Sequence, residues 1–156
     1  LQSHQPYCLP SDLKSFLLIS NGLLLRWSIR AREEVVSLGL MSLNPIADIV
    51  PIDLGMGTTP PRFTAAYSLD SSSNSGRVAL VYLADSTTSK EAQVWFQDLA
   101  AKWHFIANTF TDYFRLMIMH LGLPHWQHVF TDIGLDTASK VGHFIAPDLD
   151  FSPSKP

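Results

Sequence analysis

The first predicted element is a short helix near the start of the chain. Leu13, Phe16 and Leu17 have the spacing of one helix face, and Ser11 is the predicted N-cap residue. Asn21-Gly22 follows, and these residue types tolerate the left-handed conformation in which many helices end. The pattern therefore predicts an amphipathic helix between residue 11 and the stop at residues 21–22.

A strand is predicted directly after this stop, because the hydrophobic period changes to two. Arg26 and Arg30 lie on one face of the run. Four apolar side chains share the other face: Leu23, Leu25, Trp27 and Ile29. We expect a half-buried strand with a basic outer face.

Further strands are predicted by alternating or β-branched runs, at residues 35–43, 63–69, 78–83 and 92–96. The run 78–83 is apolar on both faces, which favours a central place in a sheet. Polar, Gly-rich or Pro-rich segments predict turns and loops at 44–45, 54–62, 70–76 and 86–90. Residues 46–54 are ambiguous, and Pro51 argues against a central strand there.

The final third of the chain is predicted to be helical. Thr109 and Asp112 have the spacing of a capping box, and Gly122 and Pro124 mark the end of the helix. Its apolar stripe is Phe110, Tyr113, Phe114, Met117, Ile118 and Leu121. Shorter helices are expected at 125–131 and 136–143. One helix, then strands, then helices indicates a single α+β domain with a mostly antiparallel sheet flanked by helices.

Composition restricts the function classes. The 156 residues, 46% of them hydrophobic, suffice for one globular domain with a real core. The formal charge of −3 argues against nucleic acid or an anionic membrane as the main partner. Cys8 is the only cysteine, which excludes a disulfide framework. The most apolar stretch, 105–123, contains Asp112 and Arg115, so we expect no membrane span and an intracellular, cytoplasmic protein.

Catalytic and metal-binding motifs give little support for an enzyme. A single helix through 125–132 would place His125, His128 and Asp132 on one face, a spacing that a zinc or iron site can use. Surface or hydrogen-bonded histidines are the alternative. The chain has no H-E-x-x-H or G-x-S-x-G motif, and Gly55-x-Gly57 lacks the third glycine of a phosphate loop. We therefore predict no catalytic residue, no bound cofactor and no metal.

The candidate partner contacts are aromatic and basic. Core packing is the main interpretation for Trp27 and Trp95, which fall inside predicted strands. For Trp103 and Trp126, which flank the long helix, core packing and partner contact both stay open. The full set of candidate contacts is Trp103, His125, Trp126, His128, Arg26 and Arg30. The two arginines can attract an acidic peptide or form an ordinary solvated strand face.

The stretch LPSDLKSFLLISNG, residues 9–22, resembles the signature of the SUKH superfamily. That superfamily includes fungal cell-wall regulators and bacterial toxin-immunity proteins. The resemblance implies an α+β fold and a binding module rather than an enzyme. On this basis we expect an irregular segment at 1–8, a SUKH-like domain at 9–145 and a flexible tail at 146–156. From the same resemblance we expect the helix that precedes Leu-Pro in the superfamily to be absent or truncated in these 156 residues.

A second resemblance is carried by the Trp-rich block VWFQDLAAKWHFIANTFTDYFRLMIMHLGLPHWQHVFTDIGLDTASK, residues 94–140. Together with RWSI, SLGLMSLNPI and SLDSSSNSGRVALVYL earlier in the chain, it is similar to a family of tubulin polyglutamylase complex subunits. The resemblance implies a non-catalytic scaffold whose partners include a tubulin-tyrosine-ligase-like catalytic subunit, with tubulin touched indirectly. It also implies a location at microtubules, basal bodies and cilia. A SUKH-type module with a different partner is the alternative.

Overall fold

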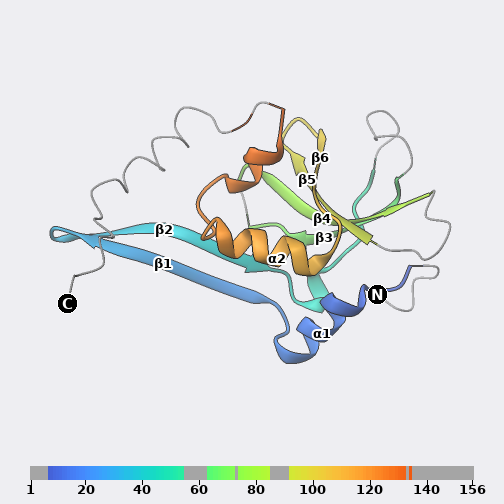
Figure 1. Cartoon of the computed structure of the whole chain (residues 1–156), viewed down its shortest axis with the longest axis horizontal. Coiled ribbons are helices and arrows are strands. Elements are labelled where there is room, and N and C mark those ends of the chain that lie inside the picture. The colour runs from blue at the N-terminus through green and yellow to red at the C-terminus, as the bar shows by residue number, and fades with distance from the viewer. Residues whose placement is uncertain (1–6, 55–62, 73, 85–91, 133, 135–156) are drawn as a thin grey trace, which may run out of the picture.

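The computed structural model of the chain describes residues 7–54, 63–72, 74–84, 92–132 and 134, and Figure 1 shows the arrangement of their elements. These residues form an α+β fold, as the sequence predicts. The helices are α1 (Ser11–Ile19), α2 (Phe110–Met119) and two short 3₁₀ segments, η1 (Ile46–Asp48) and η2 (Trp126–Phe130). The strands are β1 (Leu23–Ala31), β2 (Glu34–Leu43), β3 (Phe63–Asp70), β4 (Gly76–Leu83), β5 (Ala92–Asp98) and β6 (Trp103–Ala107).

Four of these strands form an antiparallel sheet in the order β3-β4-β5-β6. The strand β4 lies between β3 and β5, which confirms the central position predicted for residues 78–83. A segment after η1 runs along the outer edge of β3: the Ser68 amide donates to the Val50 carbonyl, and the Ile52 amide donates to the Ala66 carbonyl, both at 2.9 Å. Pro51 lies at this edge opposite Tyr67, where its missing N–H costs no ladder bond.

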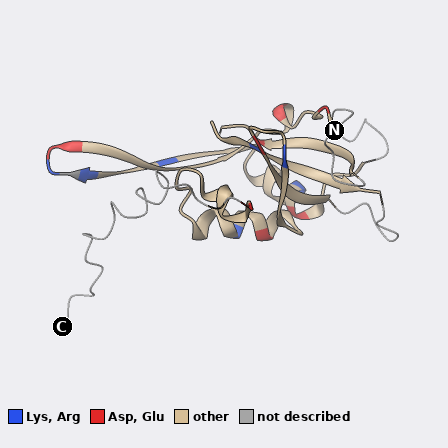
Figure 2. Ribbon diagram, turned by 90° about the horizontal axis from the view of Figure 1, so that it is seen from above, with Lys and Arg blue, Asp and Glu red and all other residues tan. Residues whose placement is uncertain are grey.

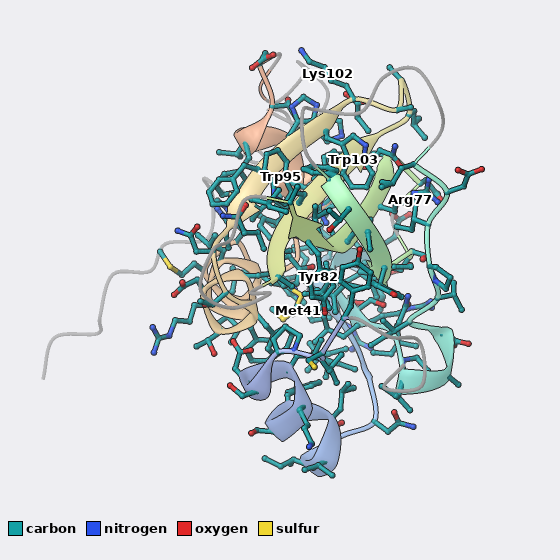
Figure 3. All side chains as sticks on the ribbon, turned by 90° about the vertical axis from the view of Figure 1, so that its right-hand side faces the viewer. Met41, Arg77, Tyr82, Trp95, Lys102 and Trp103 are labelled. Atoms are coloured by element: carbon teal, nitrogen blue, oxygen red, sulfur yellow. The ribbon has the colours of Figure 1, made fainter. Side chains whose placement is uncertain are left out.

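The sheet buries apolar side chains on both faces. Alternate residues of β4 separate cleanly: Val78, Leu80 and Tyr82 belong to the core under α1 and α2. Ala79 and Val81 belong to a second, smaller cluster with Trp103. Figure 3 shows Trp95 and Trp103 on this second side of the sheet. A strand buried on both faces needs apolar residues at successive positions, which is what the sequence of β4 contains.

The two helices are joined through Asp12. One carboxylate oxygen of Asp12 accepts the amide of Leu13 at 2.9 Å, and the other accepts the amide of Thr111 at 2.8 Å, in the first turn of α2. The residue before α1 is Pro10 and makes no side-chain cap, so the predicted cap by Ser11 is replaced by this carboxylate. The cap predicted for α2 is confirmed, since Thr109 accepts the Asp112 amide at 3.1 Å.

The later elements differ from the prediction in two places. Strand β6 is absent from the predicted elements; it pairs with β5 from Val94↔Ala107 to Gln97↔Trp103. The expected helix at 125–131 is the 3₁₀ segment η2, which begins at Trp126. The expected helix at 136–143 lies outside the described residues, as do most of the expected loops at 54–62 and 86–90.

Candidate functional site

The strands β1 and β2 form a hairpin that projects from the rest of the fold, and we call this hairpin the arm (Figures 1 and 2). Its two strands pair from Leu23↔Leu43 to Ala31↔Glu34, with one β-bulge between Trp27 and Ser28. The turn at the tip is Arg32-Glu33, and Arg32 has a φ of 58°. In Figure 2 both charge signs are visible at the tip. Among the described residues, the far end of this two-stranded arm is thus held by its own ladder alone.

The two faces of the arm differ in their basic residues but share exposed apolar side chains. Trp27 and Ile29 lie on one face, as the sequence predicts, and Val36 pairs with Ile29 on that face. Arg26 and Arg30 are exposed on the other face, and Val35 pairs with Arg30 there. Large apolar side chains are exposed on both faces: Leu24 66%, Leu25 46%, Val35 66% and Val36 38%. Exposed apolar side chains gathered on one projecting element are typical of a protein contact surface.

The base of the arm is anchored to the segment that follows α2. The indole nitrogen of Trp27 donates to the Leu121 carbonyl at 2.7 Å, and the Leu40 amide donates to the Gly122 carbonyl at 2.8 Å. Gly39 lies at the centre of this contact. A Cβ atom there would stand 2.0 Å from the Trp27 indole nitrogen, so the close approach requires glycine. Strands β1 and β2 thus contact the segment after α2, which lies far from them in the sequence.

A pocket of about 260 Å³ opens beside this anchor. Its walls come from residues 37–40 of β2, from the end of β3 with the loop that follows it, and from residues 122–127. Asp70, the last residue of β3, is in the wall and is buried. Sequence reasoning did not select Asp70; the available signal was an acidic residue at the end of a strand whose other residues are largely apolar or small.

The six sequence-predicted contact residues differ in exposure: three are exposed, two are buried and His128 is intermediate. Arg26 and Arg30 on the arm are exposed, and so is His125, which precedes η2 with a φ of 62°. Trp103 and Trp126 are buried, with 7% and 3% of their surface exposed. The structure therefore places three of the candidates where a partner can reach them and two in the interior of the isolated chain.

The buried tryptophans pack against other rings. Trp126 stacks on His120 at a ring distance of 5.2 Å and lies 5.9 Å from Tyr113. Trp103 packs edge-on against Phe63 at 5.3 Å. His128, the remaining candidate, is half-buried with its ring 5.2 Å from Phe96. These contacts favour core packing for both tryptophans.

Trp27 and Trp95 are less buried than Trp103 and Trp126. On the sequence alone, their positions in predicted strands favour core packing. Trp27 is half-buried in the arm, and its contact with the body is the hydrogen bond to Leu121. Trp95 is half-buried as well, between Phe63 and Phe105. A position in a predicted strand indicates which side chains share a face of the sheet. Whether a side chain is buried depends on what covers that face.

The histidines and Asp132 do not converge on one point. The rings of His125 and His128 are 5.7 Å apart, while the Asp132 carboxylate pairs with the Lys102 ammonium at 2.5 Å. Within the described residues, no three His, Cys, Asp or Glu side chains are grouped as metal ligands. No helix among those residues is both long and apolar enough to cross a membrane.

Comparison with known proteins shows that the sequence of this chain is similar to those of tubulin polyglutamylase complex subunits. Over 85% of its length the chain is 34% identical to the Tubulin polyglutamylase complex subunit 2 of Homo sapiens and 32% identical to that of Mus musculus. The chain is homologous to tubulin polyglutamylase complex subunit 2. It spans about half the length of these relatives, 53% of the human protein and 54% of the mouse protein. No family model and no solved structure matches it.

Proposed function

We propose that the chain serves as a non-catalytic scaffold or adaptor in a tubulin polyglutamylase complex. In this proposal a tubulin-tyrosine-ligase-like subunit carries out the ligation of glutamate to tubulin tails, and tubulin is contacted indirectly. The observation that carries the proposal is the homology to subunit 2 over 85% of the chain. The expected location is the cytoplasm, at microtubules, basal bodies and cilia.

The arm is the part of the fold best suited to this role. It presents exposed Leu25 and Val36 on one face, and on the other exposed Arg26 and Arg30 beside exposed Leu24 and Val35. A partner that covers the apolar face removes large side chains from water, while the arginines can select an acidic partner surface. We infer that the arm contacts another subunit of the complex. His125, exposed beside the pocket at the arm's base, is included in this contact.

Co-purification tests the proposal directly. The tagged chain is expressed in ciliated cells and recovered under gentle conditions, and its partners are identified by mass spectrometry. We expect a tubulin-tyrosine-ligase-like subunit among them, with tubulin glutamylation activity in the recovered fraction. Recovery of a defined set of other partners, with no glutamylation activity, would instead favour a binding module for a different complex.

A matched pair of variants then locates the contact. The double variant Leu25→Ser with Val36→Thr removes exposed apolar surface from the arm and should lower recovery of the partner subunits at least tenfold. Leu99→Ser is the control, because Leu99 is 79% exposed in the turn between β5 and β6, away from the arm. Equal recovery with both variants would exclude the apolar face of the arm as the contact.

A further inference from the structure

The pocket at the base of the arm has a composition that fits one kind of ligand. Its volume of about 260 Å³ is below the usual range for cofactors and drug-sized molecules, roughly 300–1,000 Å³, and suits a single side chain. Leu38, Leu40 and Leu123 provide apolar wall. Asp70 and Gln127, both in the wall, are buried polar residues with 4% and 5% of their surface exposed. The pocket thus combines an apolar lining with buried oxygen acceptors.

Asp70 is a buried carboxylate with no basic partner among the described residues. One of its oxygens accepts the Ser72 amide at 2.9 Å and the Ser72 hydroxyl at 2.7 Å, and the Ser42 hydroxyl also donates to this carboxylate. No ion pair joins Asp70 to a basic side chain of the described residues. Burial raises the pKa of Asp70, while the hydrogen bonds from Ser72 and Ser42 act in the opposite direction. A buried charge of this kind gains most from a cationic partner.

A second buried polar group interacts electrostatically with this carboxylate. The Tyr113 side chain is fully buried, and within the described part of the chain its hydroxyl has no hydrogen-bond partner. Burial and, after it, the charge of Asp70 hold the pKa of Tyr113 well above its usual range. The Tyr113 hydroxyl is therefore a second buried oxygen that senses the charge of Asp70, although Tyr113 does not line the pocket.

We propose that this pocket binds an arginine side chain of another polypeptide, with the guanidinium paired to Asp70 and the aliphatic stem against Leu38 and Leu123. Arginine fits better than lysine because its five donors match several acceptors at once: the Asp70 carboxylate, the Ser72 hydroxyl and the side-chain amides of Asn74 and Gln127. The weaker hydration of the guanidinium also lowers the cost of burying it. The inference does not depend on which complex the chain joins.

The experiment compares two small molecules on the unaltered chain. The ¹⁵N-labelled protein is titrated with N-acetyl-arginine amide and, separately, with N-acetyl-citrulline amide, which has nearly the same shape and no charge. We expect saturable shifts of the Gly39, Asn74 and Gly122 amides, with the arginine compound binding at least tenfold more tightly. Equal binding of the two compounds, or no shift with the arginine compound, would overturn the proposal. This comparison does not require any variant to fold.

The variant Asp70→Asn assigns the binding to the carboxylate. It keeps the shape of the side chain and removes its charge, so the arginine compound should bind as weakly as the citrulline compound does. Lys102→Met is the matched control, since it removes the partner of an exposed carboxylate, Asp132, away from the pocket and should leave the affinity unchanged. Tight binding of the arginine compound to Asp70→Asn would contradict the assignment.

Discussion

The arm and the four-stranded sheet are both built from antiparallel strands, but they differ in what covers them. In the sheet, Val81 of β4 and Val94 of β5 have no exposed surface, because Val94 faces the core under the helices and Val81 faces the second cluster. In the arm, Leu24 and Val35 are two-thirds exposed. A two-stranded sheet has no layer of its own to bury against, so its side chains stay in water unless something else covers them.

This difference indicates which part of the chain contributes most to folding stability and which part is available for contact with a partner. Packing free energy is concentrated in the sheet and its helices, where side chains have neighbours on all sides. The arm depends on its ladder, on the Trp27–Leu121 hydrogen bond and on the close approach at Gly39. An element with little burial can change its surface at small cost to the fold, which suits a contact surface.

The largest expected effect is the loss of a fully buried ring in the sheet. Phe96→Ala leaves a cavity in the main core and should lower the free energy of unfolding by about 3–5 kcal/mol. The equivalent change in the arm, Ile29→Ala, should cost less than about 1 kcal/mol, since Ile29 is only half-buried. Urea denaturation measures both, and equal losses would show that the arm is packed as tightly as the sheet.

An intermediate effect is expected at the base of the arm. Gly39→Ala forces the Trp27 indole away from the Leu121 carbonyl, because the new methyl would stand 2.0 Å from the indole nitrogen and 2.5 Å from that oxygen. We expect a loss of about 1–3 kcal/mol and a shifted indole N–H resonance for Trp27. Ser37→Ala in the same strand, at an exposed position, is the control. An unchanged indole resonance in Gly39→Ala would show that the anchor is not needed.

The smallest expected effect is a loss of stability at low pH that affects the four-stranded sheet and not the arm. Burial acts to raise the pKa of Asp98, but the hydrogen bonds from His104 and from the Lys102 amide outweigh it and leave that pKa below its ordinary value. The stabilisation is therefore present above about pH 4 and is lost as the pH falls through the lowered pKa in the folded state.

The measurement is hydrogen exchange at pH values from about 5 down to about 3. The amides of β5 and β6 near Asp98 should lose protection, equivalent to about 1 kcal/mol or less, while the arm should not follow. Asp98→Asn removes the pair and should abolish the pH-dependent part. Protonation of Asp70 acts in the opposite direction, because its pKa is raised, so Asp70→Asn serves to subtract that contribution. Equal loss in the arm would contradict a local origin.

Local patterns in the sequence sufficed for most of the secondary structure. The alternation of Trp27 with Arg26 predicts β1, and the stripe through Phe110, Tyr113 and Met117 predicts α2 together with its cap. Strand β6 has only five residues, WHFIA, in which His104 interrupts an otherwise apolar run, so neither period stands out. Part of the predicted stripe also fails, since Ile118 is 46% exposed at a position that the helical period assigns to the core.

The candidate site was predicted only in part. Arg26 and Arg30 lie on an exposed strand face as expected, because alternation fixes which side chains share a face. The burial of Trp103 and Trp126 could not be deduced, since it depends on rings from distant segments, such as Phe63 and Tyr113. Asp70 was missed for the same reason: a single acidic residue acquires meaning only when three separate segments close around it.

The sequence by itself determined the fold class, the identity of the central strand and the homology to a polyglutamylase subunit, because each rests on residues close together or on matching order along the chain. The tertiary structure alone decided that β1 and β2 leave the body as an arm, and that Gly39, Trp27 and Leu121 hold its base. The physical reason is that burial is a property of the neighbours that surround a side chain. A hydrophobic pattern states which residues need cover, and only the folded chain states which of them receive it.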